Sequence, residues 1–169
     1  MSKTFIGLGT NIGNRSANLR EAIDILIEKG IKVKKESAVY ETEPIGVVEQ
    51  GWFYNMVVEA DAETSPEDLL LRAKSIEQEM GREESIKWGP RLIDIDVLLY
   101  DNLVLETKVD GHELRLPHPE LKNRAFVILP LLDIQPKAKL PGGSKIDDYV
   151  QATEGQKVKK IGRLEELDE

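Results

Sequence analysis

The chain has 169 residues, with 31 acidic and 23 basic side chains, a net charge of −8 and no cysteine. The length fits one domain with one core, and we expect a single domain over 1–169 in which segment 137–169 has no assigned role. The negative charge argues against a nucleic-acid or anionic-membrane binder, and the lack of cysteine excludes disulfides and thiolate metal sites. Without a signal peptide or about 18 consecutive apolar residues, we expect a cytoplasmic protein, and a monomer.

The first part of the chain predicts a strand, a helix and a second strand. Residues 3–8 have the composition of a short strand, and a turn with Gly9 and Gly13 follows. The next helix has apolar residues at helical spacing, and Gly30 is placed to end it. A second strand is expected within 31–42, before a loop marked by proline and glycine.

The middle of the chain predicts a third strand and a second helix. Residues 52–60 alternate, which places Phe53 and Asn55 on one face of a strand. Ser65 has the character of a helix cap, with proline at the first helical position, and Gly81 ends that helix.

The remaining segments complete the predicted order of elements. A polar loop leads to an apolar strand over 92–100, a small helix is expected near Glu120, and 127–132 is an apolar run. The order strand, helix, strand, strand, helix, strand indicates an α+β fold, the ferredoxin-like βαββαβ sandwich. We expect a mainly antiparallel sheet with helices packed on one face.

Two aspartates interrupt the apolar strand. Asp94 and Asp96 share one face of it, with their α-carbons roughly 6.6 Å apart, while Ile93, Ile95, Val97 and Leu99 are expected on the opposite, core face. Like charges side by side are destabilising unless a cation lies between them. Such a pair suits Mg²⁺, or two metals flanking a phosphoryl group. The alternative is an amphipathic strand whose polar face is solvated.

Basic and aromatic residues near this strand suggest a ligand. Guanidinium groups match phosphate geometry, so carboxylates beside arginines favour a polyphosphate. Taken singly, each basic residue is better explained as a solvated surface charge. An aromatic ring beside an amide, as at Phe53 and Asn55, suits a flat heterocycle, although a face covered by helices explains the pair equally well. Trp88 could be a lid element or a packing anchor. The basic residues in question are Arg82, Lys87, Arg91, His118, Lys122 and Arg124.

A longer motif is more specific. The stretch 88–98, WGPRLIDIDVL, resembles the signature of the 6-hydroxymethyl-7,8-dihydropterin pyrophosphokinase family, a family of folate biosynthesis with the ferredoxin-like fold. The resemblance extends along most of the chain, through Gly9-Thr10-Asn11, Tyr40-Glu41-Thr42, Phe53-Tyr54-Asn55, Gly81-Arg82, Pro117-His118 and Asn123-Arg124-Ala125-Phe126.

The resemblance implies an activity and a set of site residues. Members transfer the β,γ-pyrophosphoryl group of ATP to the hydroxymethyl oxygen of the pterin and release AMP. By resemblance, Asp94 and Asp96 hold two Mg²⁺ ions, and Arg82 and Arg91 neutralise charge on the transferred group. The implied pterin-binding residues are Thr42, Pro44, Ile45, Phe53, Asn55, Trp88 and Phe126, and the implied ATP-binding residues are Lys87, Arg91, His118 and Arg124.

Some positions depart from the family pattern. Arg82 is followed by two glutamates where members often carry a second arginine, Lys87 replaces a common arginine, and Pro119 follows His118 where some members have tyrosine. The tail beyond Lys137 matches poorly, so no functional residue is assigned to it. Two rivals stay open: a two-metal nucleotidyl or sugar transferase, and a non-catalytic ferredoxin-like module that binds a ligand or RNA.

Overall fold

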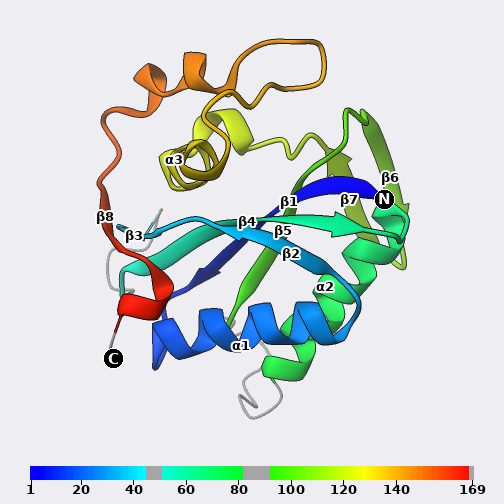
Figure 1. Ribbon diagram of the computed structural model, residues 1–169, viewed down its shortest axis with the longest axis horizontal. Coiled ribbons are helices and arrows are strands. Elements are labelled where there is room, and N and C mark those ends of the chain that lie inside the picture. The colour runs from blue at the N-terminus through cyan, green and yellow to red at the C-terminus, as the bar shows by residue number, and fades with distance from the viewer. Residues whose placement is uncertain (45–50, 82–91, 168–169) are drawn as a thin grey trace.

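The computed structural model describes residues 1–44, 51–81 and 92–167, which form an antiparallel sheet with helices on both faces (Figure 1). The sheet has six strands in the order β5-β1-β4-β3-β8, with β2 also paired to β4, and every pairing is antiparallel. The strands are β1 (Ser2–Thr10), β2 (Lys32–Glu36), β3 (Val39–Thr42), β4 (Phe53–Ala62), β5 (Asp94–Tyr100) and β8 (Val158–Gly162). A separate hairpin joins β6 (Leu105–Val109) to β7 (His112–Leu116).

Helices cover the two faces of the sheet unequally. Figure 1 shows α1 (Arg15–Glu28) and α2 (Pro66–Met80) on one face and α3 (Ala125–Ile134) on the other. The prediction of helices on one face is therefore wrong. Phe5, Val57 and Leu99 point away from α1 and α2, and a second apolar cluster with Ile128 and Leu131 of α3 covers them. Burying both faces removes more apolar surface from water than one layer of helices could.

Local sequence explains where the first two helices begin and end. The Asn14 side chain accepts a hydrogen bond from the Ala17 N–H (3.0 Å), and the Ser65 hydroxyl accepts one from the Asp68 N–H (3.1 Å). These caps satisfy backbone donors that have no partner within the helix. Gly30 follows α1 with a φ of +90°, a backbone conformation that favours glycine. The predicted helix over 66–80 is confirmed.

The predicted second strand is divided in two. β2 and β3 both pair with β4, and Ser37 lies between them. The Ser37 N–H donates to the Val57 carbonyl (2.9 Å), and the Val57 N–H donates to the Ser37 hydroxyl (2.9 Å). Because a side-chain oxygen replaces a backbone acceptor, the strand breaks without losing a hydrogen bond to β4.

One predicted side-chain orientation in β5 is wrong. The register between β1 and β5 shifts at Phe5, so that Phe5 pairs with Leu99 and Ile6 pairs with Val97, which leaves Leu98 as an extra residue. An extra residue reverses the alternation of side chains beyond it. Leu99 therefore packs under α3, and not with Ile95 and Val97 on the side of α1 and α2.

The tail adds structure that sequence analysis did not foresee. Strand β8 pairs with β3 at the edge of the sheet. Three single turns of 3-10 helix also lie in the tail: η2 (Ile146–Tyr149), η3 (Gln151–Thr153) and η4 (Leu164–Glu166). The small helix expected near Glu120 is the 3-10 turn η1 (Leu121–Asn123), which precedes α3. The segment after α3 passes over that helix and returns to the sheet (Figure 1).

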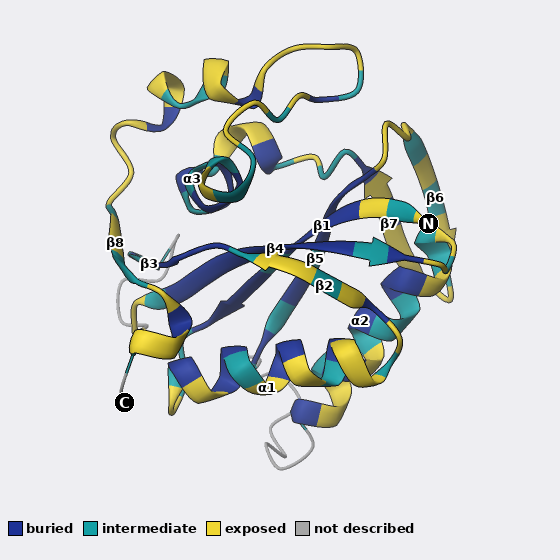
Figure 2. Ribbon diagram, in the orientation of Figure 1, coloured by how far each residue is buried: buried dark blue, intermediate teal, exposed yellow. Residues whose placement is uncertain are grey.

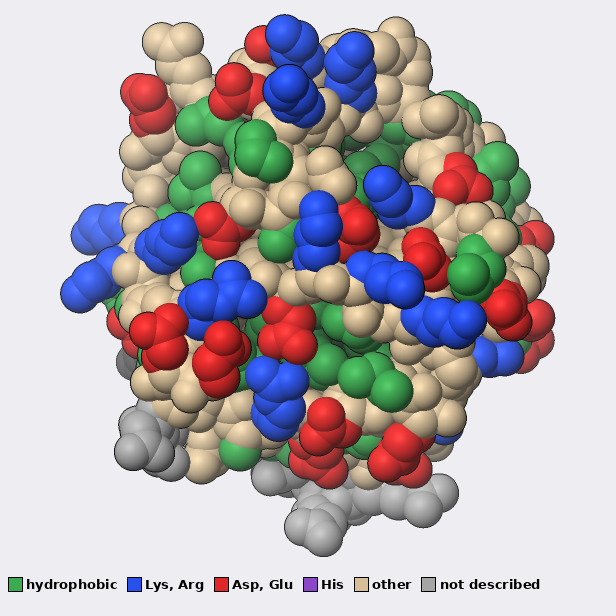
Figure 3. Space-filling view, in the orientation of Figure 1, with side chains coloured by type: hydrophobic (Ala, Val, Ile, Leu, Met, Phe, Trp, Pro, Cys, Tyr) green, Lys and Arg blue, Asp and Glu red, His purple; other side chains and the backbone are tan. Residues whose placement is uncertain are grey.

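Burial and charge follow this layering. Figure 2 shows the buried residues concentrated on the strands and on the helix faces toward them. Acidic and basic side chains are interspersed over the face drawn in Figure 3. Within 1–44, 51–81 and 92–167, no helix combines the length and apolar character needed to cross a bilayer.

Candidate active site

Four neighbouring strands align a row of residues across the sheet. Gly9 of β1 is the register partner of Asp94 on β5 and of Asn55 on β4, and Asn55 is the partner of Tyr40 on β3. Strands lie about 4.8 Å apart, so the backbones of Asp94 and Asn55 are about 10 Å apart with a glycine between them. The acidic and amide side chains thus flank a patch of bare backbone.

Three residues of this row, Gly9, Asn55 and Asp94, line a cavity of about 240 Å³. The volume is a little below the roughly 300–1,000 Å³ of sites for drug-sized molecules, so it suits a small ligand. The lining unites seven residues predicted from sequence, and two glycines of β1, a helical glutamate and several backbone and apolar neighbours complete it. The seven are Thr42, Phe53, Asn55, Asp94, Asp96, Arg124 and Phe126.

The Asn55 amide has a fixed orientation. Its side chain is buried, and its NH₂ group donates to the Thr42 hydroxyl (2.8 Å). The amide oxygen faces Gly9, because a Cβ built at Gly9 would lie 2.6 Å from it. An amide held in this way can read the polar edge of a ring with its remaining donor and acceptor capacity. Phe53 and Phe126 line the same cavity and offer aromatic faces.

A third carboxylate beside the aspartates was missed by sequence reasoning. Glu77 of α2 lines the cavity, and its carboxylate accepts a hydrogen bond from the Ile95 N–H (2.8 Å). It also forms an ion pair with Lys74 (3.3 Å). Glu77 therefore holds the backbone between Asp94 and Asp96. A polar residue on a helix gives no local signal of contact with a strand 18 residues later.

The two aspartate carboxylates fit Mg²⁺ better than a metal ion that takes all of its ligands from protein side chains. Asp94 and Asp96 are both half-buried and line one cavity. Among the described residues, no cluster of three or more acidic, histidine or cysteine side chains is arranged to hold a metal. Mg²⁺ typically binds through one or two carboxylates and completes its octahedron with water and phosphate oxygens.

A second cavity, of about 190 Å³, adjoins the first at one residue. Asp96 lines both cavities. The second is lined by Leu70 and Lys74 of α2, by Arg115 of β7 and by His118. The predicted residue His118 therefore lies beside Asp96 but outside the cavity that holds Asn55 and Phe126. Two ligands bound in these cavities would meet at Asp96.

The His118 imidazole is held in a neutral form. Its Nδ1 accepts a hydrogen bond from the Glu120 N–H (3.1 Å), which requires a lone pair on Nδ1 and places the proton of the neutral ring on Nε2. Burial lowers the pKa of His118 below its usual 6.5, and the charge of Arg124 lowers it further, whereas Asp96 and Glu120 act in the opposite direction.

This environment predicts a pH-dependent stability. The unfolded chain binds a proton at His118 at higher pH than the folded protein does, so the free energy of unfolding should fall as the pH drops from 6.5 through the lowered pKa. His118→Asn retains an acceptor for the Glu120 N–H without titrating. Urea unfolding of the ligand-free protein between pH 5 and pH 7.5 should therefore show a flatter pH dependence in this variant. Wild-type slopes in His118→Asn would contradict the assignment, and His112→Asn, at an exposed histidine, is the control.

The Gly9-Thr10-Asn11 motif connects the start of β5 to the first helix. The Thr10 hydroxyl donates to the Leu92 carbonyl (2.6 Å) and accepts a hydrogen bond from the Asn18 side chain (3.2 Å). Asn11 donates to the Gly51 carbonyl (3.2 Å). The motif therefore positions the backbone just before Asp94 and just before β4.

Comparison with known proteins gives this arrangement a family. The family model of 7,8-dihydro-6-hydroxymethylpterin-pyrophosphokinase (HPPK) matches residues 5–136. The chain belongs to the HPPK family. It is 43% identical over 141 residues to the 2-amino-4-hydroxy-6-hydroxymethyldihydropteridine pyrophosphokinase of Aquifex aeolicus, covering 83% of this chain and 85% of the relative. It is 40% identical over 131 residues to the enzyme of the same name from Bacillus subtilis, covering 77% and 76%.

A solved structure supports the fold of this HPPK chain. The HPPK-DHPS of Plasmodium falciparum superimposes with a TM-score of 0.71 at 18% sequence identity. The alignment covers 90% of this chain and 43% of the other, so this chain spans less than half of that longer protein. The mixed fold with an antiparallel sheet is thus shared with HPPK domain structures, and the resemblance seen in the sequence motifs is confirmed.

Five of the predicted site residues lie outside the described residues: Ile45, Arg82, Lys87, Trp88 and Arg91. Pro44 is described and half-buried next to the lining residue Glu43, but it does not itself line the cavity.

Proposed function

We propose that this protein transfers pyrophosphate from ATP to 6-hydroxymethyl-7,8-dihydropterin, giving AMP and the pterin diphosphate, in folate biosynthesis. The observation that carries the proposal is the junction of two cavities at Asp96 in a chain of the HPPK family. One cavity offers aromatic faces and an oriented amide, and the other is lined by Lys74, Arg115 and His118 together with Glu113. A transfer between two small molecules requires their reacting ends to meet at one point.

The first cavity takes the pterin. Phe53 and Phe126 stack on the ring, and Asn55 pairs with its polar edge while Thr42 holds the amide. In the proposal, Pro44, Ile45 and Trp88 also contact the pterin, the first two through backbone groups. With its ring over Gly7 and Gly9, the pterin directs its hydroxymethyl group toward the aspartates.

The second cavity takes the nucleoside end of ATP. Lys74, which is paired with Glu77, and Arg115, which is paired with Glu113, carry positive charge there, and the Nε2–H of His118 can donate to a phosphate oxygen. Arg124, which lines the first cavity, holds the triphosphate where it passes Asp96. The proposal adds Lys87 and Arg91 to the ATP contacts and assigns Arg82 and Arg91 to neutralise charge that develops on the transferred group.

Asp94 and Asp96 are proposed to hold Mg²⁺, and two ions in the full complex. When bound, Mg²⁺ neutralises the triphosphate oxygens and orients them for in-line transfer. The protein side chains bind and orient the two substrates and exclude water from them, and none needs to act as a covalent nucleophile.

We further propose the ferredoxin-like βαββαβ connectivity, which the sheet order β5-β1-β4-β2/β3 supports. We also propose a monomer, because one chain lines both cavities.

The products of the reaction test this function. The full chain, mixed with ATP, Mg²⁺ and the reduced hydroxymethylpterin, should release AMP and pterin diphosphate in equal amounts, as measured by ion-exchange chromatography. A pterin with a 6-methyl group in place of the hydroxymethyl group is the control, and it should yield no AMP. ADP or free phosphate as the main product, or no turnover, would contradict the proposal. Release of pyrophosphate would instead indicate nucleotidyl transfer.

A further inference from the structure

The C-terminal segment beyond residue 136 lies outside the match to the family model, yet it contacts both sides of the first cavity. We propose that Gln156 is a positioning residue for the pterin site and that residues 156–158, the strap, hold the start of α3 against the end of β3. This inference rests on the proposed function, because its consequence is a change in pterin binding.

The start of α3 depends on Gln156 for its cap. Arg124, at the N-cap position, makes no side-chain hydrogen bond to the helix. The Gln156 side-chain oxygen accepts a hydrogen bond from the Ala125 N–H (2.9 Å), and its NH₂ group donates to the Asn123 carbonyl (2.7 Å). The reversed amide would oppose donor to donor and acceptor to acceptor, so only one orientation satisfies both groups. A helix needs acceptors for its first N–H groups, and here a residue 31 positions later supplies one.

The residues next to this cap belong to the site. Arg124 and Phe126 flank Ala125, and both line the first cavity. The Arg124 guanidinium lies over the Phe126 ring, 5.6 Å from its centre. The two contacts of Gln156 therefore fix the backbone that carries an aromatic wall and a cation of the cavity.

The other end of the strap is bonded to the opposite wall. The Glu43 N–H donates to the Lys157 carbonyl (3.3 Å), and Val158 is the register partner of Thr42. Thr42 and Glu43 line the same cavity as Phe126. Three consecutive residues of the tail thus join the two walls, with a bend at Gln156 and the first residue of β8 at Val158, and so link the position of Phe126 to that of Thr42.

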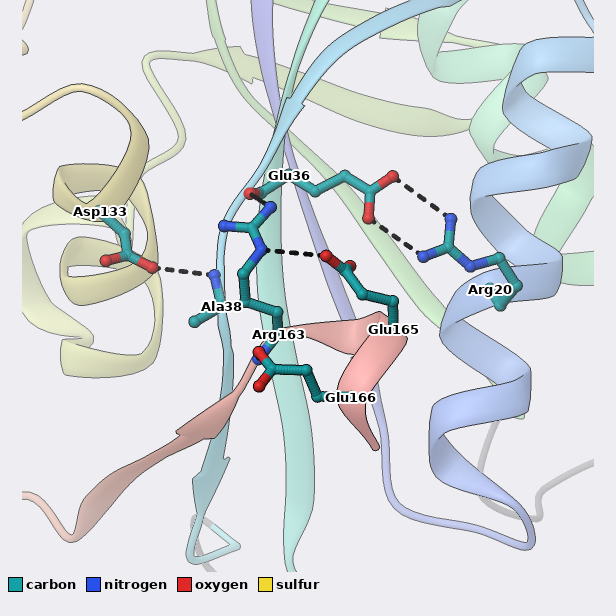
Figure 4. A network of polar contacts seen from close by, with 7 residues as sticks. All are labelled: Arg20, Glu36, Ala38, Asp133, Arg163, Glu165 and Glu166. Carbon is teal, nitrogen blue, oxygen red and sulfur yellow. Dashed lines mark hydrogen bonds and ion pairs between the residues drawn. The ribbon is translucent and has the colours of Figure 1, made fainter. Parts of the chain in front are cut away.

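The tail beyond the strap has anchors of its own. Figure 4 shows Arg163 donating to the Glu36 carbonyl (3.3 Å) and paired with Glu165 (3.4 Å), while Glu36 is paired with Arg20 (3.2 Å). Lys160 forms a further ion pair with Asp133 (3.1 Å), whose carboxylate accepts a hydrogen bond from the Ala38 N–H (2.8 Å). Because these contacts do not involve Gln156, a change at Gln156 should loosen the cavity wall without detaching the tail.

The test compares two variants of Gln156 with a control. Gln156→Met keeps the length of the side chain and removes both hydrogen bonds, and Gln156→Glu keeps only the acceptor. We expect the Kd for the pterin, measured by fluorescence titration with a non-hydrolysable ATP analogue and Mg²⁺, to rise about tenfold in Gln156→Met and by less in Gln156→Glu. The Kd for the ATP analogue alone should change less than the Kd for the pterin. Gln151→Met, at an exposed glutamine of the same tail, should bind the pterin like wild type.

The outcomes separate this inference from the proposed function. If the wild-type protein neither binds the pterin nor releases AMP, the proposed function fails. If the wild-type protein does both and Gln156→Met binds the pterin within twofold of it, the strap has no positioning role and the inference fails alone. A lowered Tm with unchanged pterin affinity in either variant would also overturn it, since that is the result of a purely structural contact. Should Gln156→Met not fold, Gln156→Glu decides on the same measurement.

Discussion

Replacing Asp96 with asparagine should lower kcat/KM for pyrophosphoryl transfer by at least about a thousandfold, or ~4 kcal/mol, with the fold intact. Asp96 lines both cavities, and in the proposed function it binds Mg²⁺ between the two substrates. Asparagine has nearly the same shape but carries no charge, and therefore loses most of the affinity for a hard cation. The rate of AMP release over a range of Mg²⁺ concentrations is the measurement.

The same substitution should not destabilise the ligand-free protein. Asp94 and Asp96 share a face, and removing one of two like charges relieves repulsion, so the Tm of Asp96→Asn should equal or exceed that of wild type. Asp110→Asn is the matched control, because Asp110 has a φ of 50° in the exposed β6–β7 turn and asparagine tolerates that conformation. Rates near wild type in Asp96→Asn at saturating substrates would remove the metal role of this carboxylate.

Replacing Gly9 with alanine should weaken pterin binding by about a hundredfold, or ~3 kcal/mol. The new Cβ would lie 2.6 Å from the Asn55 side-chain oxygen, far inside van der Waals contact. Asn55 cannot move away easily, since it is buried and bonded to Thr42. The methyl group must therefore rotate the Asn55 amide or displace β1. Either change moves the amide out of the orientation in which it is proposed to hydrogen-bond to the pterin ring. Fluorescence titration with the pterin measures the loss.

Gly7→Ala provides a graded comparison on the same strand and face. A Cβ at Gly7 would lie 3.4 Å from a methyl carbon of Leu98, a side chain that can adjust, so the change in pterin affinity should stay within about threefold. If Gly7→Ala and Gly9→Ala raised the Kd for the pterin equally, a methyl group at either glycine would block the pterin ring, and the contact with Asn55 would not be the cause. Wild-type affinity in Gly9→Ala would show that the Asn55 amide does not pair with the pterin.

The sequence by itself determined those features of the protein that depend on residues close together in the chain. The spacing of two residues in a strand placed Asp94 and Asp96 on one face, and both line the site. Ser65 and Pro66 located the start of α2. The motif from Trp88 to Leu98 indicated the family, which the comparisons confirm.

Features that depend on contacts between distant segments of the chain were decided only by the tertiary structure. The alignment of Gly9 with both Asp94 and Asn55 is a matter of register between strands, which no local pattern specifies. The extra residue at Leu98 reversed a predicted orientation because it arises from pairing with β1. Glu77 and Gln156 gave no signal in the sequence, since a helix residue and a tail residue reach their partners only after the layers have packed. Short motifs in the sequence therefore identified most of the side chains of the site, whereas long-range contacts bring those side chains together.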